Sequence, residues 1–142
     1  MSQTSATTVS QIDRTVRILI ADDFPMIRKV VRSTLEQHPH FEICGEAVNG
    51  AEAIVEAKRL KPDVVVLNVS MPVMNGLEAA REIKTILPES AIVILSQNAD
   101  RHFIEEAKTL GVRAYVAKSK AGESLVKAVE AAVLGEDFFF VE

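Results

Sequence analysis

The sequence predicts an α/β protein of (βα)5 form: a doubly wound, parallel five-stranded sheet with helices on both faces. Short apolar runs alternate five times with stretches whose apolar residues recur at helical spacing. The run Val-Val-Val-Leu at residues 64–67 is continuously apolar, as in a strand buried on both faces. Right-handed crossovers between such strands place helices on both sides of a parallel sheet.

Each strand is predicted from a short run of apolar residues, and the second run alternates with polar residues, as a strand near an edge does. The predicted strands are residues 16–21, 41–48, 64–68, 91–95 and 112–117. The helices between them begin and end at residues that favour caps or break helices. Starts are marked by Pro25, the box-like Asn49-Gly50-Ala51-Glu52 and Gly76, and ends by Pro62, Pro88, Gly111 and Gly135.

The composition is that of an ordinary globular domain. The chain has 142 residues, of which 48% are hydrophobic and 25% charged, with a net charge of −4. That charge gives no electrostatic case for nucleic-acid binding by this chain. No run approaches the roughly 18 apolar residues of a membrane span, and the start lacks the pattern of a secretory signal, so we expect no membrane association. The single cysteine, Cys44, is expected to be buried and inert, and it fits a reducing, cytoplasmic location.

Three segments are expected along the chain: a flexible leader at residues 1–14, one domain at residues 15–136, and a tail at residues 137–142. The tail contains three consecutive phenylalanines. Three roles are open for these residues: packing back on the last helix, leading into a following domain, or forming a surface for a partner. The three histidines share no metal-ligand spacing and are expected at the surface.

Polar side chains follow four of the predicted strands where each strand ends. Asp22 and Asp23 follow the first strand, Asn68 ends the third, Ser96 follows the fourth, and Lys118 follows the fifth. The carboxyl ends of parallel strands share one edge, and ligands of open α/β sheets bind there. Paired acids favour a hard cation such as Mg²⁺. The sequence therefore predicts a cation site with a neighbouring amide, hydroxyl and ammonium group.

This constellation resembles the receiver domains of two-component response regulators, which have the flavodoxin-like fold of CheY. The resemblance covers about residues 15–135, and Pro72 and Gly76 fit the loop that follows the third strand in that family. It implies that Asp22 and Asp23 hold Mg²⁺, with Asn68 and the main-chain carbonyl of Ser70 as further ligands.

The resemblance also implies roles in phosphorylation and switching. Asn68 stands at the position of the aspartate that accepts a phosphoryl group from a histidine kinase. Lys118 pairs with that group. Ser96 binds it and, with Tyr115, forms the conformational switch. The family's partners are a sensor histidine kinase or a phosphotransfer protein.

Asn68 departs from this pattern in a way that affects the central reaction. An amide has no anionic oxygen and is a very poor nucleophile toward phosphorus, although its carbonyl oxygen can still bind a metal. Loss of one charge weakens the attraction for Mg²⁺ and also removes repulsion from Asp22 and Asp23. Asn68 is either natural, in a receiver that works without phosphorylation, or a substitution made to block phosphorylation; the sequence leaves both open.

Two segments near the end of the chain resemble receivers of the NarL/FixJ type: residues 114–119, Ala-Tyr-Val-Ala-Lys-Ser, and residues 125–129, Leu-Val-Lys-Ala-Val. Such receivers belong to transcriptional regulators with a separate DNA-binding domain. By this resemblance, DNA would be bound only through an output domain outside this chain. Homodimers would form through residues 100–134 or through the first and last helices.

The main rival function is a pure interaction module that uses the 100–134 surface. A flavodoxin-like cofactor site lacks its phosphate cradle, and a P-loop is absent. A hydrolase with Asp22 as nucleophile would turn over phosphate esters. A receiver domain is not an enzyme in this sense, and we therefore expect no enzymatic turnover.

Overall fold

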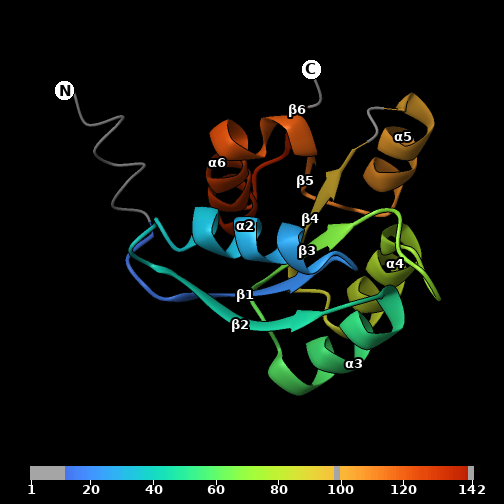
Figure 1. The fold of residues 1–142 in the computed structure, drawn as a ribbon, viewed down its shortest axis with the longest axis horizontal. Helices are drawn as coiled ribbons and strands as arrows, with labels where there is room; N and C mark the ends of the chain where they lie inside the picture. The colour runs from blue at the N-terminus through green and yellow to red at the C-terminus, as the bar shows by residue number, and fades with distance from the viewer. Residues whose placement is uncertain (1–11, 98–99, 141–142) are drawn as a thin grey trace.

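The computed structural model describes residues 12–97 and 100–140 (Figure 1). In this part of the chain a parallel sheet has the strand order β2-β1-β3-β4-β5-β6. The strands are β1 (Val16–Ala21), β2 (Phe41–Ala47), β3 (Val64–Asn68), β4 (Ala91–Ser96), β5 (Ala114–Ala117) and β6 (Phe138–Phe140). The helices are α2 (Pro25–Leu35), α3 (Gly50–Leu60), α4 (Gly76–Ile86), α5 (Arg101–Thr109), the short η1 (Lys118–Lys120) and α6 (Ala121–Val133). The doubly wound parallel fold predicted from the sequence is confirmed.

Two apolar layers hold the helices on the sheet. Helices α2 and α6 pack on one face, where Leu35 and Leu125 join β1, β3 and β4 side chains. Helices α3, α4 and α5 cover the other face, where Ala57 and Ile83 lie in the second cluster. Figure 1 shows the sheet between these two groups of helices. Each strand therefore sends alternate side chains into opposite cores, which explains the uninterrupted apolar runs.

The central strand β3 positions the candidate site. All five of its residues are buried, and it lies between β1 and β4. The chain places β2 on one side of β1 and then crosses to the other side of β1 to form β3, so the direction in which strands are added reverses between β1 and β3. Crevices at such reversals, outside the carboxyl ends of the strands, are where this class of fold binds ligands. Asn68 is the last residue of β3 and so lies at this place.

The structure corrects the expected number of strands from five to six. Residues 138–140 form β6, which pairs in parallel with β5 in the register Ala114↔Phe138 and Tyr115↔Phe139. Phe138 packs with the α2–α6 core, and Phe139 packs with the core on the opposite face. Residues 138–140 of the tail thus form a sheet edge, with Phe138 and Phe139 in opposite cores. Residues 141–142 lie outside the described residues.

Two further expectations differ from the structure. Ile12, placed in the leader, is 3% exposed and joins the α2–α6 core, so the ordered chain begins before residue 15. Residues 1–11 of the expected leader lie outside the described residues. His38 is only partly exposed: its ring stacks on Phe41 at 3.9 Å between centroids, and its Nε2 lies 3.2 Å from Glu130. It joins the end of α2 to α6 across one face of the sheet.

Cys44 lies on the edge strand β2 and is only partly buried. Burial raises the pKa of its thiol, which opposes formation of the reactive thiolate. Within the described residues, none of the helices has the length and apolar character needed to cross a membrane.

Two glycines close the loop after β3. The amide of Gly76 donates to the carbonyl of Val69 at 2.8 Å, and that of Gly50 donates to Met74 at 3.0 Å. A Cβ at Gly76 would overlap the backbone carbonyl of Asn68, and one at Gly50 would overlap the carbonyl of Met74. The starts of α3 and α4 can therefore approach this loop only because these two positions lack a side chain.

We expect Gly76→Ala to lower the free energy of unfolding by ~2–4 kcal/mol, because the added methyl group overlaps backbone that cannot move aside cheaply. Gly122→Ala is the matched control, since no atom lies within 4 Å of a Cβ placed there in α6. It should be neutral or stabilise by up to ~1 kcal/mol. Urea unfolding followed by circular dichroism measures both, and equal stability of the two variants would contradict this account of the loop.

Candidate functional site

The expected polar residues do gather at the carboxyl edge of the sheet. Ala21 lies opposite Leu67, and Asn68 lies opposite Leu95. Ser96 lies opposite Ala117, the residue before Lys118. The residues that follow β1, β3, β4 and β5 therefore emerge side by side. Asp22, Asn68 and Ser96 are all buried, at 2%, 5% and 2% exposure.

A buried ion pair joins the first and fifth strands at this edge. The ammonium of Lys118 lies 3.0 Å from Asp22 Oδ2, and the two side chains are 13% and 3% exposed. The other carboxylate oxygen, Oδ1, accepts a hydrogen bond from the amide of Phe24 at 2.9 Å. Oδ2 accepts no well-directed hydrogen bond from the described residues, so charge alone holds the contact with Lys118.

Asn68 uses its side-chain amide to bridge two oxygens. Its Nδ2 donates to the carbonyl of Ser70 at 2.8 Å and reaches Asp23 Oδ1 at 3.5 Å. Both oxygens are among those that the resemblance to receiver domains assigns to a cation. The positive end of the amide dipole thus lies among the predicted ligands and offsets part of their negative charge.

The candidate switch residues are in contact. Tyr115 is fully buried, and burial raises the pKa of its phenol, whereas a hydrogen bond with Ser96 acts in the opposite direction. The negative charge of Asp100 raises it further. Since Ser96 ends β4 beside the end of β3 at Asn68, Tyr115 is linked to this edge through one hydroxyl. The ring of Phe139 stacks with Tyr115 at 6.4 Å between centroids.

The residues present fit a hard divalent cation. Oxygen ligands from Asp22, Asp23 and the Ser70 carbonyl are the type that Mg²⁺ prefers. A buried carboxylate oxygen at Asp22 that lacks a directed hydrogen bond is suited to complete such a site. No group of three His, Cys, Asp or Glu side chains placed to hold a metal ion occurs in the described ranges. For Asn68 to present its oxygen, its amide must turn over and release Ser70.

The loop that carries Ser70 is strained at one residue. Val73 has a φ of +70°, which is rare for a β-branched side chain. The amide of Met74 donates to the carbonyl of Pro72 at 2.7 Å, so the turn around Val73 is very tight. Val73 is 81% exposed. Strain at an exposed residue is typical of loops whose conformation serves a site.

Sequence reasoning missed the arginines that support the acidic loop. Arg28 donates to the backbone carbonyl of Asp22 at 2.8 Å and to Glu46 at 2.8 Å. Arg32 also donates to Glu46, at 2.9 Å. This network fixes α2, β2 and the loop after β1 together. The available signal was two arginines one turn apart on α2, but their partner on β2 is distant in sequence.

A doubly wound sheet with paired acids, an amide, a hydroxyl and a lysine at one edge defines a class of α/β signalling domains. The comparisons identify the family. The chain belongs to the response regulator receiver domain family, whose profile matches residues 18–130.

Individual relatives agree with this assignment. The chain is 36% identical over 124 residues to the uncharacterized transcriptional regulatory protein YxjL of Bacillus subtilis, over 87% of this chain and 57% of YxjL. It is 32% identical to the response regulator protein VraR of Staphylococcus aureus, over 88% of this chain and 60% of VraR. The chain therefore spans less than two thirds of the length of these relatives.

Solved structures show the same fold. A two-component response regulator of the LuxR family from Aurantimonas sp. SI85-9A1 superposes with a TM-score of 0.84 at 31% identity, over 87% of this chain and 89% of that one. The signal receiver domain of the putative response regulator NarL from Mycobacterium tuberculosis gives a TM-score of 0.81 at 28% identity, over 87% and 99% of the two chains.

We expect Glu46→Gln to destabilise the domain by ~1–2 kcal/mol at pH 7, because two charged hydrogen bonds are weakened. Partial burial opposes ionisation of Glu46, but hydrogen bonds from Arg32 and Arg28 outweigh it and lower the pKa. The stabilisation is therefore present above the ordinary pKa of about 4.3 and is lost as the pH falls through the lower, folded-state pKa.

Thermal unfolding of the two proteins between pH 7 and pH 3 measures this effect. The difference in stability should shrink below about pH 4.3. Glu89→Gln, at an exposed carboxylate for which the structure gives no ion pair, is the control and should show little change at any pH. A constant difference across the pH range would contradict the role given to the Glu46 charge.

Proposed function

We propose that this chain is the receiver domain of a two-component transcriptional regulator in which Asn68 blocks phosphoryl transfer. The observation that carries the proposal is the amide of Asn68, which contacts Asp23 and Ser70 at the same sheet edge as the Asp22–Lys118 pair, where the family has its phosphate-accepting aspartate. The site supplies the electrostatic groups for phosphoryl transfer and lacks the nucleophile.

The neighbouring residues support these roles. Lys118 is a fixed positive charge at the edge of the site, where it would pair with phosphoryl oxygens. Ser96 offers a hydroxyl that is already coupled to Tyr115, so a new bond to Ser96 would bias the buried phenol. Asp22, Asp23 and Ser70 would hold Mg²⁺, which when bound neutralises charge on the transferring group. We infer no catalytic turnover, since a receiver is modified and does not release a product repeatedly.

The partners follow from the same assignment. We infer a cytoplasmic signalling domain that meets a sensor histidine kinase or a phosphotransfer protein at the carboxyl edge of the sheet. DNA binding would require an output domain, in line with the transcriptional regulators to which the chain is similar. Dimerisation would use either residues 100–134 or helices α2 and α6. The two surfaces share α6 and differ in whether α5 and β5 or α2 complete them.

A natural receiver that works without phosphorylation is the second candidate. One observation favours it: the Asn68 amide bridges Asp23, after β1, and Ser70, after β3, and so satisfies one oxygen in each of these two loops without a metal. Such a domain would act as a protein–protein interaction module with a permanently closed site.

The decisive variant is Asn68→Asp. Under our proposal, acetyl phosphate and Mg²⁺ add one phosphoryl group: a carboxylate oxygen attacks phosphorus, the bond to the acetate oxygen breaks, and acetate leaves. Modification should rise from undetectable to most of the protein, and Mg²⁺ should bind several-fold more tightly because one ligand regains its charge. Intact-mass spectrometry and calorimetry measure these effects.

Asn49→Asp is the matched control, because the same chemical change at the N-cap of α3 creates no acceptor. Chelation of Mg²⁺ should abolish the reaction of Asn68→Asp. A covalent gain at residue 68 of the unsubstituted protein would overturn the blocked-receiver proposal. Failure of folded Asn68→Asp to react would overturn it too and favour the phosphorylation-independent module.

A further inference from the structure

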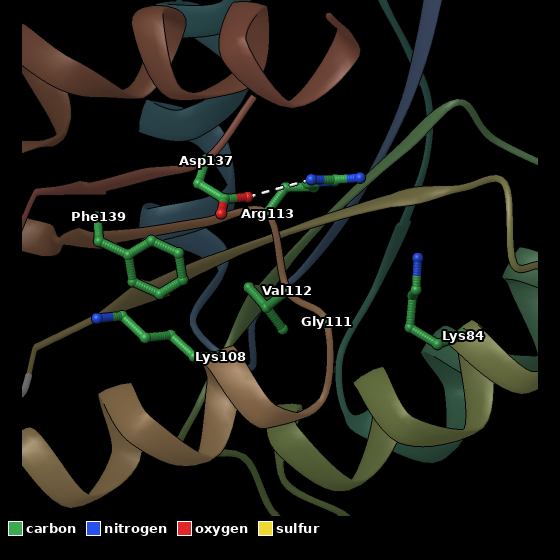
Figure 2. Close-up of a pocket in the computed structure, with 7 residues that line it drawn as sticks. All are labelled: Lys84, Lys108, Gly111, Val112, Arg113, Asp137 and Phe139. Carbon is green, nitrogen blue, oxygen red and sulfur yellow. Dashed lines mark hydrogen bonds and ion pairs between the residues drawn. The ribbon is translucent and has the colours of Figure 1, made fainter. Parts of the chain in front are cut away.

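A cavity of about 660 Å³ lies at the opposite end of the sheet from the acidic site. It opens between the second half of α4, the turn from α5 to β5, and β6 (Figure 2). Its walls include Lys84, Lys108, Val112, Arg113, Asp137 and Phe139. The volume is in the range of about 300–1,000 Å³ that is usual for small-molecule sites.

This cavity is lined mainly by positively charged side chains, although the chain has a negative net charge. Three cations from three different segments, Lys84, Lys108 and Arg113, line the cavity, and Figure 2 shows Arg113 beside the carboxylate of Asp137, with Lys84 and Lys108 on opposite sides of that pair. The chain as a whole has a net charge of −4. The three side chains come from separate elements, so the fold brings them together; they do not form a continuous basic stretch in the sequence. Such a local excess of positive charge attracts anions.

The existing contacts only partly neutralise these cations. Arg113 pairs with Asp137 at 3.2 Å, but both side chains are well exposed, at 44% and 69%. Lys108 lies 5.2 Å above the Phe139 ring and 4.0 Å from Glu105. Among the described residues, Lys84 has no carboxylate within ion-pair distance and donates instead to the carbonyl of Pro88 at 3.1 Å. Burial lowers the pKa of Lys84, and the nearby charge of Arg113 lowers it further.

The walls also offer apolar surface. Phe139 from β6 lines the cavity beside the cations, and Val112, which is 3% exposed, lies beneath its floor. Gly111, with φ of +85°, turns the chain there without a side chain, and a Cβ would meet only Lys84 Cε, at 3.8 Å. The space is larger than one inorganic ion requires. The combination fits a ligand with an anionic group and an organic body.

We propose that this cavity binds a small phosphate monoester, whose phosphoryl group contacts Arg113 and Lys84 and whose organic body extends toward Phe139 and Lys108. A phosphate monoester carries close to two negative charges at neutral pH and three acceptor oxygens. The planar Arg113 guanidinium matches such a group. The ligand competes with Asp137 for Arg113. This site is separate from the acceptor position, and the proposal does not rest on phosphorylation of the domain.

The test is a titration of the full chain with ribose 5-phosphate and with AMP, at constant ionic strength and without Mg²⁺, followed by ¹H–¹⁵N NMR. We expect saturable shifts of the Gly111, Val112, Arg113 and Phe139 amides. Inorganic phosphate should bind more weakly, and adenosine should not shift these signals. Non-saturating shifts, shifts confined to Ser96 and Lys118, or equal affinity for inorganic phosphate would overturn the proposal.

Variants of opposite sign sharpen the test. Lys84→Gln should weaken binding roughly tenfold, as expected for loss of one charge-assisted hydrogen bond. Asp137→Asn should tighten binding, because it removes the competing carboxylate. Lys29→Gln on α2 and Glu123→Gln on α6 change the same charges at exposed positions away from the cavity and should leave affinity unchanged. If each cavity variant matches its control while its NMR spectrum remains that of a folded protein, the proposal is wrong.

Discussion

The buried ion pair between Asp22 and Lys118 is the interaction on which the carboxyl edge of this domain depends. It joins the ends of β1 and β5, which are not neighbours in the sheet. Burying two charges costs free energy that their attraction offsets only with good geometry, and removing one partner typically costs about 3–5 kcal/mol. An apolar pair would close this edge at lower electrostatic cost. Retaining both charges is therefore better explained by a site that handles anions and cations than by stability.

Asn68 changes the electrostatics of that edge without changing its shape. A carboxylate at this position would bring a third negative charge beside Asp22 and Asp23, opposed by one ammonium, and repulsion would favour a bound cation. The amide removes this repulsion and supplies N–H donors for Ser70 and Asp23. The loop after β3 can then keep its tight turn with protein contacts alone. The same bonds must break before the Asn68 oxygen can face a metal.

The sequence predicts best those elements whose signal is local and continuous. The bounds of β1 and β3 match the expected 16–21 and 64–68, because each is an apolar run that ends at polar residues. The predicted cluster of Asp22, Asn68, Ser96 and Lys118 follows from the same pattern, since parallel strands end at one edge.

Features that depend on pairing between distant segments could not be predicted. Three phenylalanines in a row do not reveal which core each one enters, so β6 is recognisable only when the free edge of β5 is known. The position of His38 could not be predicted either, because its partner Glu130 lies on the last helix, far away in the sequence. The cationic cavity depends on Lys84, Lys108 and Arg113 from three separate segments.

The sixth strand also affects how Tyr115 can move. Tyr115 is fully buried, with Ser96 as a hydrogen-bond partner and Phe139 stacked beside it. Protein interiors are close-packed, so a large buried ring cannot change rotamer unless the groups that cover it move too. Phe139 is one of those groups, and it belongs to a strand of only three residues at the edge of the sheet. A short edge strand has few hydrogen bonds to hold it, so β6 is a neighbour of Tyr115 that can be displaced at low cost.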